Sequence, residues 1–258
     1  MLITDPLFYL AAVPALLILG LSKGGFGSGL GLLAVPLMAL VVTPVQAAAI
    51  ILPILCAMDL VGLRAFWRRA PVPVLVLVIP AALVGIVLGA LTFRDLSVRT
   101  LELLLGVIAL GFTAWRFVLA SRIAQRPPPG KWAGRFWALV SGYTSFVAHA
   151  GGPPLSIYLL PQRLDKTVFQ AINVVFFAVV NYVKLVPYWW LGQFDGSNLG
   201  TSLVLLPLAP LGVWLGIWCH HRLSDRWFYR ICYAALVLAG VKLVADGLLK
   251  PGGWLAAV

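Results

Sequence analysis

A series of apolar segments, most of them near twenty residues long and nearly free of charge, constrains this chain more than any other feature. Hydrophobic residues make up 62% of the 258 residues and charged residues only 10%. That composition excludes a soluble core with a polar coat, and such segments are long enough to cross a bilayer as helices. The sequence therefore predicts an all-α, polytopic integral membrane protein. The segments lie near residues 6–22, 30–42, 46–64, 72–92, 98–119, 134–150, 153–161, 168–191, 199–219 and 227–248.

The net charge of +11 alone would suggest a nucleic-acid partner, but Lys and Arg gather in the short loops between segments. That distribution is typical of the cytoplasmic loops of membrane proteins, so we expect no nucleic acid. Cys56, Cys219 and Cys232 lie in apolar segments without ligand-like spacing, which predicts neither a disulfide nor a metal. The first segment lacks a basic leader, so we expect it to belong to the mature fold.

One polar linker divides the chain into two halves that resemble each other. We predict an N-terminal repeat over residues 1–120, a cytoplasmic linker over 121–133 that contains three successive prolines, and a C-terminal repeat over 134–258. The stretch "PAALVGIVLGALTFRDLSVR" from Pro80 matches "PLAPLGVWLGIWCHHRLSDR" from Pro207 without a gap, and upstream Gln46-Ala47 pairs with Gln170-Ala171. Internal repeats of this kind are typical of transporters.

The basic residues also predict how the two halves are oriented. If the halves are inverted, thirteen basic loop residues face the cytoplasm and three face outwards, whereas parallel halves divide them almost equally. The positive-inside rule therefore favours inverted repeats with both termini outside. We expect each half to form a short broken helical hairpin and three full spans, giving about 8 to 10 membrane segments in all.

Each half opens with a break in its apolar sequence, "SKGGFGSGLG" from Ser22 and "SFVAHAGGPP" from Ser145. Glycine and proline interrupt helices, and an unwound backbone at membrane depth must line a cavity or be buried in protein. Paired breaks point to a transport site, and the helix ends beyond them favour an anion. The glycines expected at this site are Gly24, Gly25, Gly29, Gly151 and Gly152.

Polar side chains near the breaks complete the predicted site. Lys23 is a candidate anion ligand, with snorkelling to an interface as the alternative. Gln46 and Gln170 occupy equivalent positions and either bind substrate or join helices. The remaining candidates for substrate binding are Ser22, Ser28, His149 and Asn173.

Three further residues, Asp59, Asn181 and Lys184, are candidates for coupling or gating. Asp59 and Lys184 are almost opposite each other in the repeat register, so they are expected either to pair or to leave Asp59 as a proton carrier. A location of Asp59 near the cytoplasm, five residues before Arg64, is the alternative. His149 titrates near neutral pH and is a candidate proton relay or a structural residue.

At these breaks the sequence resembles the TauE/SafE sulfite exporter family, also called the 4-toluene sulfonate uptake permeases (TSUP). The resemblance rests on "SKGGFGSGLGLLAVPLMAL" with "PVQAAAI", and on "HAGGPPLSIYLL" with "FQAINVVFF", and it covers essentially the whole chain. It implies secondary transport of sulfite, sulfoacetate or related sulfonates across the bacterial inner membrane.

The leading hypothesis is thus an anion carrier that works by alternating access and needs no cofactor. A P-loop motif is absent from the sequence, so we expect no ATP hydrolysis. An anion channel would share the site, and a membrane-embedded enzyme using Ser145 or Ser156 with His149 lacks the usual hydrolase motifs. Direction of transport, proton coupling and a homodimer stay open.

Overall fold

The computed structural model describes residues 2–26, 30–119, 122, 127–220 and 225–249, and within these residues every regular element is a helix. The first half contains α1 (Pro6–Leu21), η1 (Ser22–Phe26), η2 (Leu30–Leu33), α2 (Ala34–Met38), α3 (Pro44–Phe66), η3 (Trp67–Arg69), α4 (Val72–Phe93), α5 (Val98–Ala114) and η4 (Trp115–Leu119). The second half contains α7 (Lys131–Ala148), α8 (Gly152–Leu159), η5 (Leu160–Gln162), α9 (Lys166–Trp190), α10 (Gly196–Leu205), α11 (Leu208–His220) and α12 (Asp225–Leu249).

Several of these helices are long and apolar enough to cross a membrane. Five of the described helices meet this condition, or six if α10 and α11 form one bent span. The prediction of an all-α, multi-pass membrane protein is therefore confirmed, whereas the number of segments and the repeat layout stay predictions. The five are Pro6–Gly24, Pro44–Arg69, Val72–Phe93, Val98–Leu119 and Thr167–Trp190.

Polar residues at the segment boundaries fix where the helices begin. A side-chain oxygen of the residue before the helix accepts a backbone N–H of the first turn, which satisfies a donor that the helix itself cannot. These N-terminal caps are Asp5 for α1, Thr43 for α3, Ser97 for α5, Asp165 for α9 and Asp195 for α10. The apolar segments found in the sequence therefore correspond closely to the helices.

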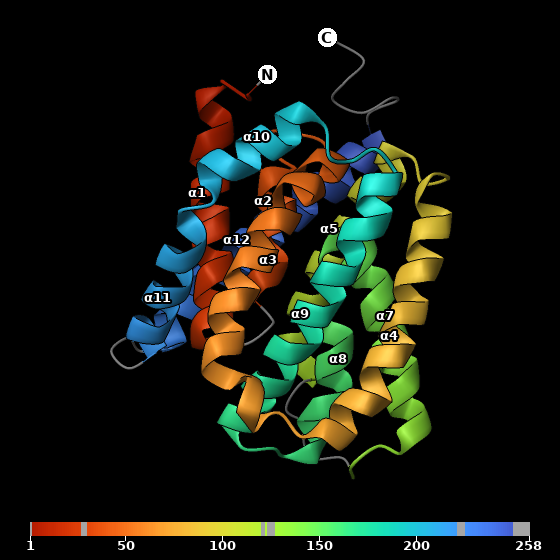
Figure 1. The fold of residues 1–258 in the computed structure, drawn as a ribbon. Coiled ribbons are helices and arrows are strands. Elements are labelled where there is room, and N and C mark those ends of the chain that lie inside the picture. Colours follow the sequence, from red (N-terminus) through yellow and green to blue (C-terminus); the bar gives the residue numbers. More distant parts are fainter. Residues whose placement is uncertain (1, 27–29, 120–121, 123–126, 221–224, 250–258) are drawn as a thin grey trace.

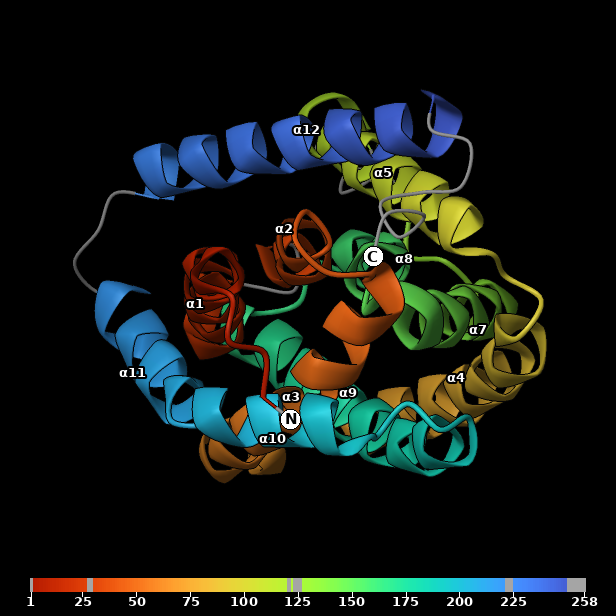
Figure 2. The ribbon, with the colours of Figure 1, turned by 90° about the horizontal axis from the view of Figure 1, so that it is seen from above.

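The helices run in a regular pattern through the bundle (Figure 1). In that view α1, α3 and α5 run downwards, whereas α7, α9 and α12 run upwards. Helix α4 runs upwards and α11 downwards, and α10 lies across the upper end of the bundle. The view from above shows α2, α8 and the beginning of α3 near the middle of the bundle, with other helices around them (Figure 2).

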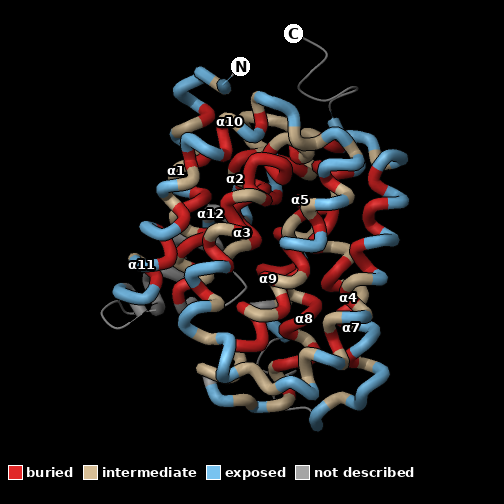
Figure 3. The backbone as a smooth tube through the Cα atoms, viewed as in Figure 1, coloured by how far each residue is buried: buried red, intermediate tan, exposed pale blue. Residues whose placement is uncertain are grey.

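Burial identifies α3 as the central helix. In its most apolar stretch 67% of the residues are buried, compared with 33% in α4. Helix α3 contributes to both hydrophobic clusters of the core, through Ile50 and Ile51 to one and through Ala48 and Leu52 to the other. Buried residues accordingly concentrate along the inner helices, and the outer faces of α4 and α11 are exposed (Figure 3). Exposed apolar residues on those faces are expected to contact lipid.

The two halves pack against each other through glycines. Helix α4 lies against α7, and α11 lies against α1. A methyl group on Gly142 of α7 would lie 2.0 Å from the Ala82 carbonyl oxygen of α4, and one on Gly20 of α1 would lie 2.6 Å from the Gly212 backbone of α11. Only glycine permits backbones to approach this closely, as in other membrane helix pairs. We call these two contacts the glycine seams.

Two details differ from the expected segments. The two segments expected near residues 6–22 and 30–42 differ in length. Helix α1 with its π-helical extension η1 is long enough to span a membrane, whereas α2 is one short turn. The segment near 199–219 is bent by 41° between α10 and α11. Pro207 lies at this bend and has no N–H to continue the helix.

Candidate functional site

The two predicted breaks meet at one cavity of about 60 Å³. It lies among η1, the start of η2 and α2, the middle of α3, the α7–α8 junction and one face of α9. Its polar lining consists of Ser22, Lys23, Ser145, His149, Gln170, Asn173 and Asn181. Its apolar lining consists of Leu19, Ala34, Ile51, Leu55, Val174 and Phe177, and the backbones of Gly31 and Gly152 complete the wall. Residues far apart in the sequence therefore form a single polar site inside the bundle.

In the first half, α1 continues into the π-helical turn η1 before the break. The Ser22 Oγ accepts the Gly31 N–H at 3.0 Å, so it joins the two sides of the break. Gln170 Nε2 of α9 donates to the Lys23 carbonyl oxygen at 2.9 Å. A carbonyl group released by irregular backbone inside a membrane needs such a donor. The first break is therefore held in place by a side chain of the second half.

In the second half, α7 ends at His149, which has a left-handed backbone conformation with φ 51°. Ser141 Oγ donates to the Gly151 carbonyl oxygen at 2.6 Å, and Thr144 Oγ1 donates to the Ala150 carbonyl oxygen at 3.1 Å. Helix α8 then begins at Gly152 without a side-chain cap. Its positive end therefore lies at the cavity, since Gly152 is part of the lining.

Lys23 lies at the cavity but is not a free cation. Its ammonium group forms an ion pair with Asp59 Oδ1, and Asn181 Nδ2 donates to Asp59 Oδ2 at 2.6 Å. The Lys23 Nζ also lies 5.6 Å from the centre of the Phe177 ring. The Asp59 carboxylate is fully buried, and a charge in that position requires a partner.

This ion pair corrects one expectation about the charged residues. Asp59 pairs with Lys23 and not with Lys184, and its side chain is fully buried. Repeat register suggested the pairing with Lys184, but register says nothing about which side chain extends far enough to reach the carboxylate.

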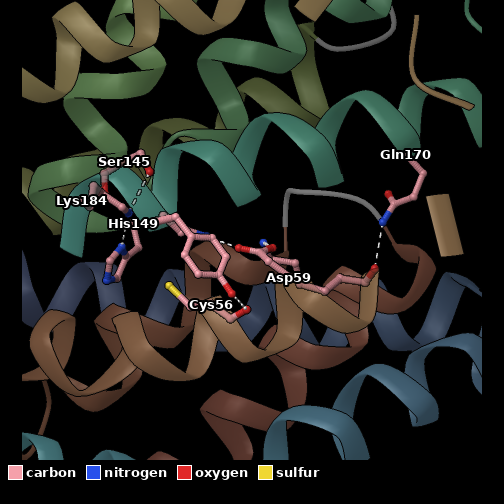
Figure 4. A network of polar contacts seen from close by, with 9 residues as sticks. Cys56, Asp59, Ser145, His149, Gln170 and Lys184 are labelled. Carbon is pink, nitrogen blue, oxygen red and sulfur yellow. Dashed lines mark hydrogen bonds and ion pairs between the residues drawn. The ribbon is translucent and has the colours of Figure 1, made fainter. Parts of the chain in front are cut away.

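Lys184 is fully buried on α9 and contacts only neutral groups in its hydrogen bonds (Figure 4). Its Nζ donates to the Ser145 carbonyl oxygen at 2.9 Å, contacts Ser145 Oγ at 3.1 Å and contacts His149 Nδ1 at 2.8 Å. The His149 Nε2 lies 3.0 Å from the Ala48 carbonyl oxygen. Because the Ala48 carbonyl oxygen only accepts, Nε2 carries the proton of that bond. We assign Lys184 as the donor to Nδ1, and with this assignment His149 is a neutral imidazole.

Several predicted site residues lie elsewhere. Gly24 lies in the seam with α11, where a methyl group would be 2.5 Å from the Val213 carbonyl oxygen. Gln46 lies in the first turn of α3 and outside the cavity lining, so the structure does not place it in the same role as Gln170. Gly151 is buried beside the lining residue Gly152, and Gly25 lies within η1. Ser28 and Gly29 lie outside the described residues.

The face of α9 is the part of the site that the sequence could have shown completely. Gln170, Asn173, Val174, Phe177 and Asn181 recur at intervals of three or four residues and all line the cavity. This spacing places residues on one face of a helix. The sequence prediction includes only the polar members, Gln170, Asn173 and Asn181, and the signal that identifies Val174 and Phe177 is their position between these residues on the same helix face.

The hydroxyl of Ser145 and the ring of His149 are held by other groups. Ser145 Oγ accepts from Lys184 Nζ, and both ring nitrogens of His149 are engaged with Lys184 and Ala48. Among the described residues, no three His, Cys, Asp or Glu side chains come close enough together to hold a metal ion. The donors at the cavity can hold a small polar molecule.

Comparisons with known proteins identify one family. The family model described as "Sulfite exporter TauE/SafE" matches residues 12–243. A search of curated proteins finds no match, and neither does a search of solved structures. The family model covers most of the chain, including both breaks and every residue that lines the cavity. The chain therefore belongs to the TauE/SafE sulfite exporter family, whose members are membrane transporters of sulfite or related anions.

Proposed function

We propose that this protein is a secondary transporter that binds a small sulfur-containing or organic anion, such as sulfite, sulfoacetate or a related sulfonate, in the cavity between the breaks. The observation that carries this proposal is that both breaks border one cavity with the positive end of α8 in its wall. That helix end favours negative charge. The predicted residues that contribute to this site are Ser22, Lys23, His149, Gly152, Gln170 and Asn173.

The size of the cavity fits this class of substrate. A volume of about 60 Å³ corresponds to roughly four to six water-sized positions, since one water needs about 10–15 Å³. A sulfite ion or the sulfonate end of a small organic molecule has a comparable number of heavy atoms. The apolar wall formed by Ile51, Leu55, Val174 and Phe177 offers a surface for a short carbon chain. A sulfonate has a polar end that can contact the polar lining and a carbon chain that can contact the apolar lining.

We infer that the two halves form an inverted repeat and that transport proceeds by alternating access. Helix directions support this, because α1, α3 and α5 run opposite to α7, α9 and α12 (Figure 1). The two glycine seams support it as well. Helix α4 of the first half packs against α7, the first helix of the second half, and α11 of the second half packs against α1, the first helix of the first half. In transporters built this way, one repeat moves against the other around a fixed site.

The family supports a location in the bacterial inner membrane, and the charges in the loops support an orientation with the basic loops in the cytoplasm. In this orientation the upper end of the bundle in Figure 1, where α1 begins and α12 ends, faces outwards. The α9–α10 loop, which carries Gln193 and no basic residue, lies at that same end.

Counterflow in proteoliposomes tests the proposed function. Labelled sulfite or sulfoacetate outside the vesicles should accumulate when the same anion is loaded inside. Flux that follows only the electrical gradient would contradict the carrier and indicate a channel. Chemical turnover of the anion without flux would indicate an enzyme.

A pair of isosteric variants links that flux to the cavity. Asn173→Asp should abolish uptake, because it adds a negative charge to the lining at the position of a carboxamide oxygen that accepts no hydrogen bond from the residues the structure describes. Gln193→Glu, an equal change of charge in the α9–α10 loop, should leave uptake near the level of the unmodified protein. Equal uptake by the two variants, at equal thermal stability, would remove the cavity from the pathway.

A further inference from the structure

Three charged side chains surround the cavity in the described part of the bundle. Lys23 and Asp59 form an ion pair, and Lys184 lies on the α9 face that also carries Asn181. His149 is neutral in the assignment in which Lys184 donates to its Nδ1. Among the described residues, the thiol of Cys56 and the hydroxyl of Tyr182 also interact electrostatically with Asp59, and both are uncharged near neutral pH. The charges around the cavity therefore add up to a single excess positive charge.

The hydrogen bonds of Lys184 match an ammonium group. A protonated lysine has three N–H donors, and three acceptors lie within 3.1 Å of Nζ. These acceptors are a carbonyl oxygen, a hydroxyl oxygen and an imidazole nitrogen, so none of them neutralises the charge. A buried charge without a counterion is costly, and the cost disappears when an anion binds nearby. Ser145 and His149, which hold Lys184, both line the cavity.

We propose that Lys184, rather than Lys23, supplies the charge that the transported anion neutralises, and that the site is matched to one net negative charge. This inference rests on the proposed function and narrows its substrates to monoanions, such as hydrogensulfite or a monosulfonate, in preference to dianions such as sulfoacetate. Lys23 already has Asp59 as its counterion. If Lys23 paired with the anion instead, the buried Asp59 carboxylate would lose its partner, which is energetically unfavourable. Lys184 acts through Ser145 and His149 and does not itself line the cavity.

A purely structural role is the competing explanation for Lys184. Its three hydrogen bonds also fix His149 and the end of α7, and removing them would disturb the cavity. Both explanations predict that Lys184→Met weakens anion binding. They differ in what a second substitution does, because Asp59→Asn restores the net charge of the site but restores none of the hydrogen bonds of Lys184.

The test is a charge series measured by binding of methanesulfonate, a monoanion, and sulfoacetate, a dianion, to purified protein in detergent. Lys184→Met should bind methanesulfonate at least about tenfold more weakly, since one unit charge is lost at short range in a poorly hydrated site. Lys184→Met with Asp59→Asn should recover most of that loss. Lys23→Met should also bind weakly, and adding Asp59→Asn to it should improve binding.

The Asp59→Asn variant alone tests the charge assignment while Lys184 and its hydrogen bonds stay in place. It raises the net charge around the cavity by one, so the preference should shift from methanesulfonate towards sulfoacetate by at least about tenfold. An unchanged preference, or a double variant as weak as Lys184→Met, would overturn the charge assignment and leave the transporter proposal standing. Unmodified protein that binds neither these two anions nor sulfite would overturn both proposals.

Discussion

The seam between α4 and α7 provides the most direct test of the helix packing. In Gly142→Ala the added methyl group would lie 2.0 Å from the Ala82 carbonyl oxygen, whereas ordinary contact begins at about 3.4 Å. The clashing atom belongs to the backbone, so no side-chain rotation relieves it. The two helices must separate by more than about 1 Å, which weakens every van der Waals contact along the seam. Overfilled cores commonly lose 1–3 kcal/mol, and we expect a loss of about 3 kcal/mol here because nothing flexible can yield.

Thermal unfolding in detergent, followed by tryptophan fluorescence, measures this effect. For a chain of this size a loss of about 3 kcal/mol lowers the melting temperature by roughly 6–12 °C. Gly111→Ala in α5 is the matched control, because its methyl group would meet no atom within 4 Å. Alanine is the better helix former, so this variant should melt at the same temperature or slightly higher.

Two outcomes would refute the reasoning. An unchanged melting temperature for Gly142→Ala would show that α4 and α7 do not approach as closely as described. An equal fall for both variants would show that any added methyl group destabilises the fold and that the seam has no special role.

Two more predictions concern the break and the orientation. Gln170→Leu leaves the Lys23 carbonyl oxygen without its donor. The free energy of unfolding should therefore fall by about 1–3 kcal/mol, and backbone hydrogen exchange in η1 should accelerate. An unchanged exchange rate would mean that another group holds the break. In a background without the native cysteines, Gln193→Cys should react with an impermeant thiol reagent in intact cells and Arg163→Cys only after permeabilisation. The reverse pattern would invert the assigned orientation.

Much of the fold was predictable because a membrane leaves few alternatives. A helix in lipid must satisfy all its backbone groups internally, so apolar segment lengths and polar boundary residues nearly determine the helices. The irregular turn η1, which follows α1 at the start of the predicted break, is an example in which local sequence alone was sufficient. The bend between α10 and α11 was marked by Pro207, although a proline does not by itself specify an angle.

The charge pattern of the site was not predictable from the sequence. Lys23 and Asp59 are 36 residues apart, and their pairing depends on how η1 packs against α3. Gln46 and Gln170 are equivalent in the repeat register, yet only Gln170 reaches the cavity. Register compares positions along two halves, whereas side-chain contacts depend on the helices that surround each position. For that reason the sequence indicates Lys184 as a candidate, but only the contacts show that its hydrogen-bond partners among the described residues are uncharged groups.

The two glycine seams also affect how the chain is made. Helix α1 packs against α11, which emerges from the ribosome about 190 residues later, or roughly 10–40 s at ordinary rates of synthesis. Helix α4 finds its partner α7 much sooner. During that interval the glycine face of α1 is without its native neighbour and open to lipid or other membrane proteins. A nascent chain that stops before α11 should therefore be a substrate for membrane quality control, even though its first half is complete.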